Sequence, residues 1–255
     1  MTDEERFDEI LAELGELMLD LGDLSSRVML IGGQVLALES RQRGGTGVIS
    51  IETDTGIVVE RGFSYEPDLL FDMEDSDFMA ERLPEVLRQR GYARTREFRW
   101  SKSLTGGQMD LDLFAPKDVD PEQLPTRMTP LPDARLALRR SHAVVLVEGK
   151  PLRILLPDAV GFLAMKERAK REQRPDKTKD SFDMFAYVKL MGSQQVRTSL
   201  QEAGQEGRAL RDRLLNLFWN TDAPGPRDVI RYAASLEPDE QALLAQAAVD
   251  LFAEL

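Results

Sequence analysis

The chain has 255 residues, of which 42% are hydrophobic and 31% charged, so it can form one large domain or two small ones with a buried core. It contains no cysteine and one histidine, His142, which excludes disulfide frameworks, thiolate chemistry and sites built from several histidines. The net charge of −12 argues against an extended nucleic-acid groove, although seven basic residues within 166–179 leave room for a local anion site.

Nothing in the sequence indicates a membrane protein. Apolar runs such as 143–147 are far too short to cross a bilayer, and the acidic N-terminus is unlike a signal peptide. The absence of cysteine is compatible with a reducing compartment. We therefore expect a cytoplasmic protein without a membrane partner, whose acid–base or metal chemistry must rely on carboxylates.

Hydrophobic periodicity predicts an α/β half that extends to residue 157. Helices are expected at 4–20, 34–41 and 76–89, the last of them capped by Ser76. Strands are expected at 28–31, 48–51, 57–59, 68–73, 96–102, 109–114, 143–147 and 152–155. The turn at 52–56 predicts a hairpin between the second and third strands, and Glu148-Gly149-Lys150 predicts another between the last two.

The rest of the chain has helical periodicity throughout. Helices are expected at 158–172, 179–190, 196–203, 208–217, 226–235 and 239–254. The predicted fold class is therefore α+β, with an α/β domain at 1–157 and a helical domain at 158–255. No internal repeat or low-complexity tract interrupts either half.

Two acidic stretches suggest a metal site. In a strand, Glu66 and Asp68 would share a face with their Cα atoms roughly 6–7 Å apart, which suits two ligands of one Mg²⁺. Asp110 and Asp112 share a face of the alternating stretch "MDLDLF". If the two strands pair, the carboxylates converge, and like charges this close require a cation. Asp72, about 13 Å from Asp68 along the strand, is expected to be peripheral.

Other interpretations of these stretches remain open. Acids that alternate with apolar residues are also typical of the solvated face of an antiparallel sheet. Pro67 fits an edge strand better than a central one. Four arginines near the acidic strands could either bind phosphate or pair with the acids, namely Arg61, Arg94, Arg96 and Arg99.

The order of these features resembles a known superfamily. Gly32-Gly33 closes a strand and opens a helix, Ser64-x-Glu66-x-Asp68 follows, and a third acid lies on "MDLDLF". This order is similar to that of the DNA polymerase β-like nucleotidyltransferases. Residues 156–188, "LPDAVGFLAMKERAKREQRPDKTKDSFDMFAYV", resemble the AbiEii-type branch, the nucleotidyltransferase-like toxins of toxin–antitoxin pairs. Together the matches cover most of 28–190.

The resemblance implies a fold, a reaction and roles for individual residues. The fold would be a nucleotidyltransferase-like mixed sheet flanked by helices, followed by a C-terminal helical region. The reaction would be Mg²⁺-dependent transfer of a nucleoside monophosphate from an NTP to an acceptor hydroxyl. The implied phosphate contacts are Gly32, Gly33 and Ser64. The implied metal ligands are Glu66, Asp68 and Asp110, with Asp112 as a competing third acid. Nucleotide-binding or structural roles fall to Lys166, Lys179, Asp180 and Asp183.

The acceptor and the biological role also follow from the resemblance alone. It implies an RNA acceptor such as a tRNA 3′ end, and a cognate antitoxin protein as partner. Three features depart from the family pattern: Glu66 stands where an aspartate is usual, Pro67 separates the proposed ligands, and the segment between Gly33 and Ser64 is long. Two alternatives follow, a small-molecule nucleotidyltransferase of the antibiotic-modifying type and a binding protein with a degenerate metal site.

Overall fold

The computed structural model describes residues 1–62, 64–73, 82–124, 126–146 and 152–255. The chain forms two compact units: Met1–Val48 with Gly62–Pro157, and Ile49–Arg61 with Asp158–Leu255. The sequence predicts the same border after residue 157 but places 49–61 in the first domain. Arg61 and Asp54 form ion pairs with Asp183 and Lys189, and these contacts attach the 49–61 segment to the helical unit.

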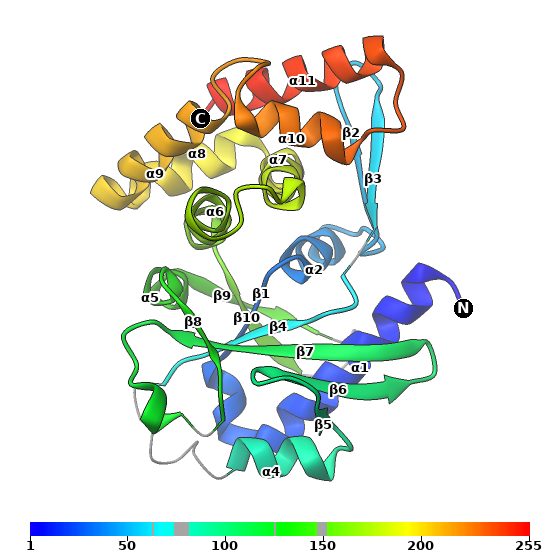
Figure 1. Cartoon of the computed structure of the whole chain (residues 1–255), viewed down its shortest axis with the longest axis vertical. Coiled ribbons are helices and arrows are strands. Elements are labelled where there is room, and N and C mark those ends of the chain that lie inside the picture. Colours follow the sequence, from blue (N-terminus) through cyan, green and yellow to red (C-terminus); the bar gives the residue numbers. More distant parts are fainter. Residues whose placement is uncertain (63, 74–81, 125, 147–151) are drawn as a thin grey trace. The chain divides into compact units, whose positions relative to one another are not determined.

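The first unit is built on a mixed sheet (Figure 1). Its strands are β1 (Val28–Ile31), β4 (Asp68–Phe71), β5 (Ala93–Arg94), β6 (Arg99–Leu104), β7 (Gly107–Pro116), β8 (Thr129–Leu131), β9 (Ser141–Val145) and β10 (Arg153–Pro157). They run in the order β5-β6-β7-β4-β1-β10-β9, with β8 beside β7. Two pairs at the centre, β1–β10 and β4–β7, are parallel, whereas β1–β4 is antiparallel. The predicted α+β class with a mixed sheet is confirmed.

The central strands carry continuous apolar runs because both of their faces are covered. All four residues of β1 are buried, as are Leu69, Leu70 and Phe71 of β4. Because β4 lies between β1 and β7, it is an interior strand. Pro67 therefore does not mark an edge; it precedes the strand, and its carbonyl accepts a hydrogen bond from the Asp112 N–H at 3.0 Å.

Helices cover both faces of this sheet (Figure 1). They are α1 (Asp3–Leu21), α2 (Gln34–Gln42), α4 (Arg82–Gln89) and α5 (Ala134–Arg139). The amphipathic α1 buries an apolar stripe, and a capping box between Thr2 and Glu5 satisfies its first N–H groups. The predicted cap Ser76 and the hairpin turn at 148–150 lie outside the described residues. The short elements β5, β8 and α5 are absent from the prediction.

The second unit combines a two-stranded sheet with helices. β2 (Ile49–Glu52) pairs with β3 (Val58–Gly62), as predicted. The helices are α6 (Ala159–Arg168), a π-helical turn (Ala169–Gln173), α7 (Thr178–Met191), α8 (Ser193–Glu202), α9 (Gly204–Leu217), α10 (Pro224–Tyr232) and α11 (Pro238–Ala253). Stacked aromatic pairs fill the core, among them Phe162 with Tyr187 and Phe218 with Phe252. Within the described residues, no helix is both long enough and apolar enough to cross a membrane.

Candidate functional site

A glycine turn brings the first carboxylate of the site against the start of α2. β1 ends at Ile31, Gly32 adopts a positive φ of 71°, and Gly33 is the N-cap of α2. Ile31 pairs with Asp68 across the β1–β4 ladder. A Cβ built on Gly32 would lie 2.0 Å from Oδ2 of Asp68. Only glycine tolerates both this backbone conformation and this contact, so the turn holds Asp68 at the helix N-terminus.

The segment that precedes β4 is tied to the same helix end. Gln34, the first residue of α2, is fully buried, and its Nε2 donates to the Ser64 carbonyl at 2.6 Å. This bond holds Ser64 near the glycine turn. Oε1 of Gln34 is buried and accepts no hydrogen bond within the described part of the chain. The prediction omits Gln34; its position directly after the two glycines is the signal that could have identified it.

Strand register decides which acid accompanies Asp68. In the parallel β4–β7 pair, Asp68 lies opposite Asp112. Asp110 is two residues away on the same face of β7, so the pairing of β4 with β7 places both acids of β7 on the face of Asp68. Glu66, however, lies in a bend before β4, which begins at Asp68. Glu66 and Asp68 therefore do not share a strand, although Glu66 and the register partner of Asp68, Asp112, bind the same arginine.

Arg99 on β6 is the cation at the centre of the acidic cluster, which we define as Glu66, Asp68, Asp110 and Asp112. Its Nε and Nη2 bind the two carboxylate oxygens of Asp112 at 2.6 and 2.7 Å. Its Nη1 donates to Asp110 at 3.0 Å, and Glu66 lies 3.2–3.3 Å away. Of the two roles open to this arginine, the structure has it paired with the acids. These bonds, chiefly those to Asp112, raise the pKa of Arg99.

Asp110 accepts hydrogen bonds on both of its carboxylate oxygens. Besides Arg99, it accepts hydrogen bonds from Ser101 Oγ at 2.7 Å and Gln108 Nε2 at 2.6 Å. Partial burial acts to raise the pKa of Asp110, but these bonds and the charge of Arg99 outweigh burial and lower it. Asp110 is therefore held ionised, with both of its oxygens engaged.

The metal assignment stays a prediction. Within the described residues, no three acidic or histidine side chains are grouped so that they could hold a metal ion. By chemical type the acids suit Mg²⁺, which prefers carboxylate oxygens and often takes only one or two from the protein. Asp68 and Asp112, opposite each other beside the glycine turn, are the pair whose placement fits best.

The second unit buries another set of predicted residues. Lys166 on α6 binds Asp183 at 2.6 Å and Asp180 at 3.2 Å, both on α7, and Arg61 binds the other oxygen of Asp183 at 2.6 Å. Burial opposes ionisation of Lys166 and Asp183, but the opposite charges around each of them outweigh it. The pKa of Lys166 is consequently raised, and that of Asp183 is lowered to about 2. Lys179, by contrast, is exposed.

This buried network extends beyond the predicted residues. Lys170, in the π-helical turn, pairs with Asp228 of α10 at 2.6 Å, and Ser181 Oγ donates to the same carboxylate at 2.6 Å. Arg174 lies 2.9 Å from Asp180. Asp180 and Asp183 thus join α6, α7 and the end of β3 through ion pairs. The sequence carries no local signal for Asp228, because its partners lie far away along the chain.

Comparisons with known proteins do not assign the chain to a family. No protein-family model matches the chain, and no curated protein matches it. One solved structure is similar, the crystal structure of an antigenic nucleotidyltransferase-like protein from Paracoccidioides brasiliensis. It has 16% sequence identity and a TM-score of 0.46, over 81% of this chain and 92% of that one. A likeness of this degree carries no information about chemistry, so any functional conclusion depends on the site itself.

Proposed function

We propose that the first unit binds a nucleoside triphosphate at the Gly32-Gly33 turn and transfers its nucleoside monophosphate to an acceptor hydroxyl. The observation that carries this proposal is the contact between Gly32 and Asp68. A helix N-terminus offers backbone N–H groups and a positive dipole end to a phosphate. Here that helix end lies directly beside a carboxylate that is opposite a second one, Asp112. Phosphate binding and metal ligands next to each other are what phosphoryl transfer requires.

The proposed step forms one bond to the α-phosphorus of the NTP and breaks another. The acceptor oxygen bonds to the α-phosphorus, the bond from that phosphorus to the bridging oxygen breaks, and pyrophosphate leaves with the electron pair. A carboxylate of the acidic cluster takes the hydroxyl proton. Gly32, Gly33 and Ser64 would position the triphosphate. Mg²⁺, the proposed cofactor, would be held by Asp68 and Asp112 and would offset the negative charge of the phosphates when bound.

The acceptor that we propose is RNA, such as a tRNA 3′ end. This rests on the sequence resemblance of 156–188 to the AbiEii-type toxins. One specific observation favours the alternative of a small cationic acceptor such as an aminoglycoside: the net charge of −12 repels a polyanion and attracts a cation. Incubation with labelled NTPs, Mg²⁺ and either tRNA or aminoglycosides separates the two.

The enzyme proposal is tested by replacing single carboxylates. Asp68→Asn and Asp112→Asn should each reduce label transfer at least 100-fold, because each removes a metal ligand. Asp72→Asn is the control: Asp72 pairs with Arg135 outside the acidic cluster, and transfer should stay within about twofold. Equal activity of Asp68→Asn and Asp72→Asn would refute the assignment.

A non-catalytic nucleotide-binding protein is the second candidate, and the pairing of Arg99 with three acids favours it. In that case NTPs should raise the melting temperature, and Gly32→Ala should abolish the shift, yet no label should reach any acceptor. The absence of both a thermal shift and transfer would count against both candidates.

The biological role that we propose is that of a toxin held in check by an antitoxin protein. Induced expression should arrest bacterial growth, whereas expression of Asp68→Asn at the same level should not. Co-expression of the neighbouring gene should restore growth if that gene encodes the antitoxin. Growth unaffected by the wild-type protein, despite measured transfer activity, would reject the toxin role and leave the enzyme proposal intact.

A further inference from the structure

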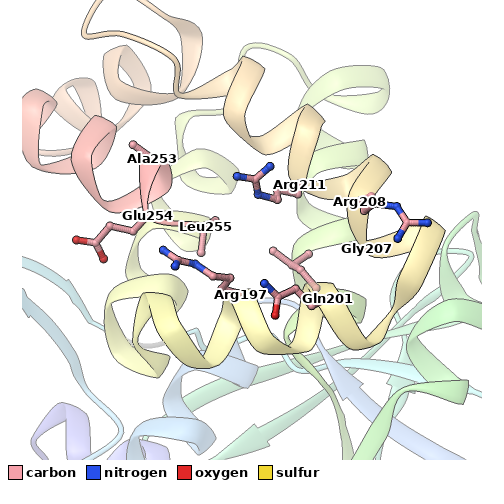
Figure 2. A pocket seen from close by; sticks show the side chains of 9 residues that line it. Arg197, Gln201, Gly207, Arg208, Arg211, Ala253, Glu254 and Leu255 are labelled. Carbon is pink, nitrogen blue, oxygen red and sulfur yellow. The ribbon is translucent and has the colours of Figure 1, made fainter.

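The second unit contains a basic cavity that no proposed step uses. It has a volume of about 520 Å³ and is lined by α8, the first half of α9 and the end of α11 (Figure 2). Three arginines line it: Arg197 from α8, and Arg208 and Arg211 from α9. The one acidic side chain that lines it, Glu254, accepts a hydrogen bond from the Ser193 hydroxyl. Three guanidinium groups therefore face one side-chain carboxylate in this cavity, and Leu255, the last residue of the sequence, lines it as well.

These arginines differ in their pairing from other arginines of the second unit. Elsewhere in this unit arginines pair with acids, as Arg171 and Arg213 do with Glu167. Within the described ranges, Arg197, Arg208 and Arg211 form no ion pair with an acidic side chain. Nε of Arg197 is buried and donates no hydrogen bond there. A buried donor without an acceptor costs free energy, and a ligand that brings an acceptor would recover it.

The shape of the cavity depends on close contact between two helices. A Cβ on Gly207 would lie 1.8 Å from the Leu200 carbonyl, so glycine allows α9 to start directly against α8. The N-terminal turn of α9, which includes Gly207, thus borders the cavity and adds the positive end of a helix dipole. Figure 2 shows Arg197 and Arg211 on either side of Leu255, while Arg208 extends away at the far end.

We propose that this cavity binds a phosphate group, with Arg197 and Arg211 as its principal ligands and Arg208 at the rim. Guanidinium groups and a helix N-terminus are the donors that bind phosphate best in proteins. The phosphate belongs either to a small polyphosphate such as pyrophosphate or to the backbone of a single-stranded RNA. The site does not depend on the proposed nucleotidyl transfer, because none of its residues belongs to the first unit.

The test uses the full chain and two double variants of equal charge. Arg197→Gln/Arg211→Gln removes the proposed ligands, whereas Arg227→Gln/Arg231→Gln removes two exposed arginines of α10 that do not line the cavity. Isothermal titration calorimetry measures binding of pyrophosphate and, separately, of a short single-stranded oligoribonucleotide. Each titration is carried out at low and high salt, and urea unfolding of each variant is recorded.

We expect at least one probe to bind the wild type, with affinity that falls as salt is raised. The cavity variant should bind at least tenfold more weakly, and the α10 variant should bind like the wild type. If pyrophosphate binds the wild-type protein, the ligand of the cavity is a small polyphosphate. If only the oligoribonucleotide binds, the ligand is the phosphate backbone of a nucleic acid. The proposal is overturned if neither probe binds, or if both variants weaken binding equally. It is likewise overturned if the cavity variant lowers the urea midpoint without affecting binding, which would mean that the arginines only support helix packing.

Discussion

At the scale of single residues, Gly32 and Arg99 determine what the acidic cluster can do. Gly32 keeps Asp68 in contact with the start of α2, and Arg99 holds three of the four acids of the cluster. One residue acts by having no side chain and the other by compensating charge. Each therefore leads to a prediction of its own.

Gly32→Ala should destabilise the protein and abolish nucleotide binding. The new Cβ would lie 2.0 Å from Asp68 Oδ2 and would also force a positive φ on alanine. Gly91→Ala is a matched control, because Gly91 has a φ of +85° but no atom within 4 Å of the added Cβ. Both variants carry the backbone cost of about 1 kcal/mol, and only Gly32→Ala should lose more than this in urea unfolding. Equal losses would show that Asp68 moves freely away from the turn.

Arg99→Gln should lower stability and raise the affinity for divalent cations. It removes charge-assisted hydrogen bonds to Asp110 and Asp112, at a cost of about 2 kcal/mol in the free energy of unfolding. The three acids that Arg99 binds then lack their guanidinium, and the acidic cluster attracts Mn²⁺ or Mg²⁺ more strongly. Calorimetric titration with Mn²⁺ measures the second effect.

Arg96→Gln provides the control for Arg99→Gln, because Arg96 is exposed and carries the same charge. It should change neither the unfolding free energy nor the cation affinity. If Arg99→Gln binds Mn²⁺ no better than the wild type, the acids do not form a cation site even when their counter-charge is removed.

At the scale of elements, α7 is held to its neighbours by buried charge. Asp180 and Asp183 lie three residues apart on one face of the helix, where Lys166 and Arg61 reach them. Such pairs stabilise the fold only while every member stays ionised. Stability of this helix packing should consequently depend on pH.

Asp183 should contribute to acid denaturation. Its pKa is lowered from 3.8 to about 2, because Lys166 and Arg61 outweigh the opposing effect of burial. A carboxylate whose pKa is lower in the folded than in the unfolded state stabilises the fold fully above about pH 4. This contribution is lost as the pH falls to about 2, and for Asp183 it amounts to about 2 kcal/mol in the free energy of unfolding. Urea unfolding between pH 6 and pH 2 should show this loss.

Asp183→Asn should be much less stable at pH 6, by about 3–5 kcal/mol, because Arg61 and Lys166 lose a buried partner. It should also lose less further stability between pH 4 and pH 2 than the wild type does. Asp212→Asn, which removes an exposed carboxylate on α9, should keep the wild-type pH profile. An unchanged acid profile in Asp183→Asn would contradict the role of this network.

At the scale of the whole molecule, net charge should distinguish the two classes of acceptor. A chain with a charge of −12 attracts cations at long range and repels polyanions, and salt screens both effects. With an aminoglycoside acceptor, kcat/KM should fall severalfold as KCl rises from about 50 to about 300 mM. With tRNA it should stay level or rise. A steep fall with tRNA would show that a local basic surface governs RNA binding despite the overall charge.

Much of the secondary structure could be predicted from the sequence. The helices, the main strands and the α+β class follow from periodicity and turn residues, which are local properties of the chain. The glycine turn between β1 and α2 and the convergence of the acidic strands were also accessible. Short elements such as β5 and β8 could not be predicted, because a segment of two or three residues is too short to show a hydrophobic periodicity.

The way in which these parts combine follows from tertiary contacts and not from local sequence patterns. The tertiary structure placed Asp112 rather than Asp110 opposite Asp68, put Arg99 among the acids, assigned the β2–β3 hairpin to the helical unit and buried Lys166. Each of these outcomes depends on contacts between residues far apart in the sequence. Strand register and ion pairing are set by packing across the whole unit, whereas a sequence pattern reports only which residues share a face of one element.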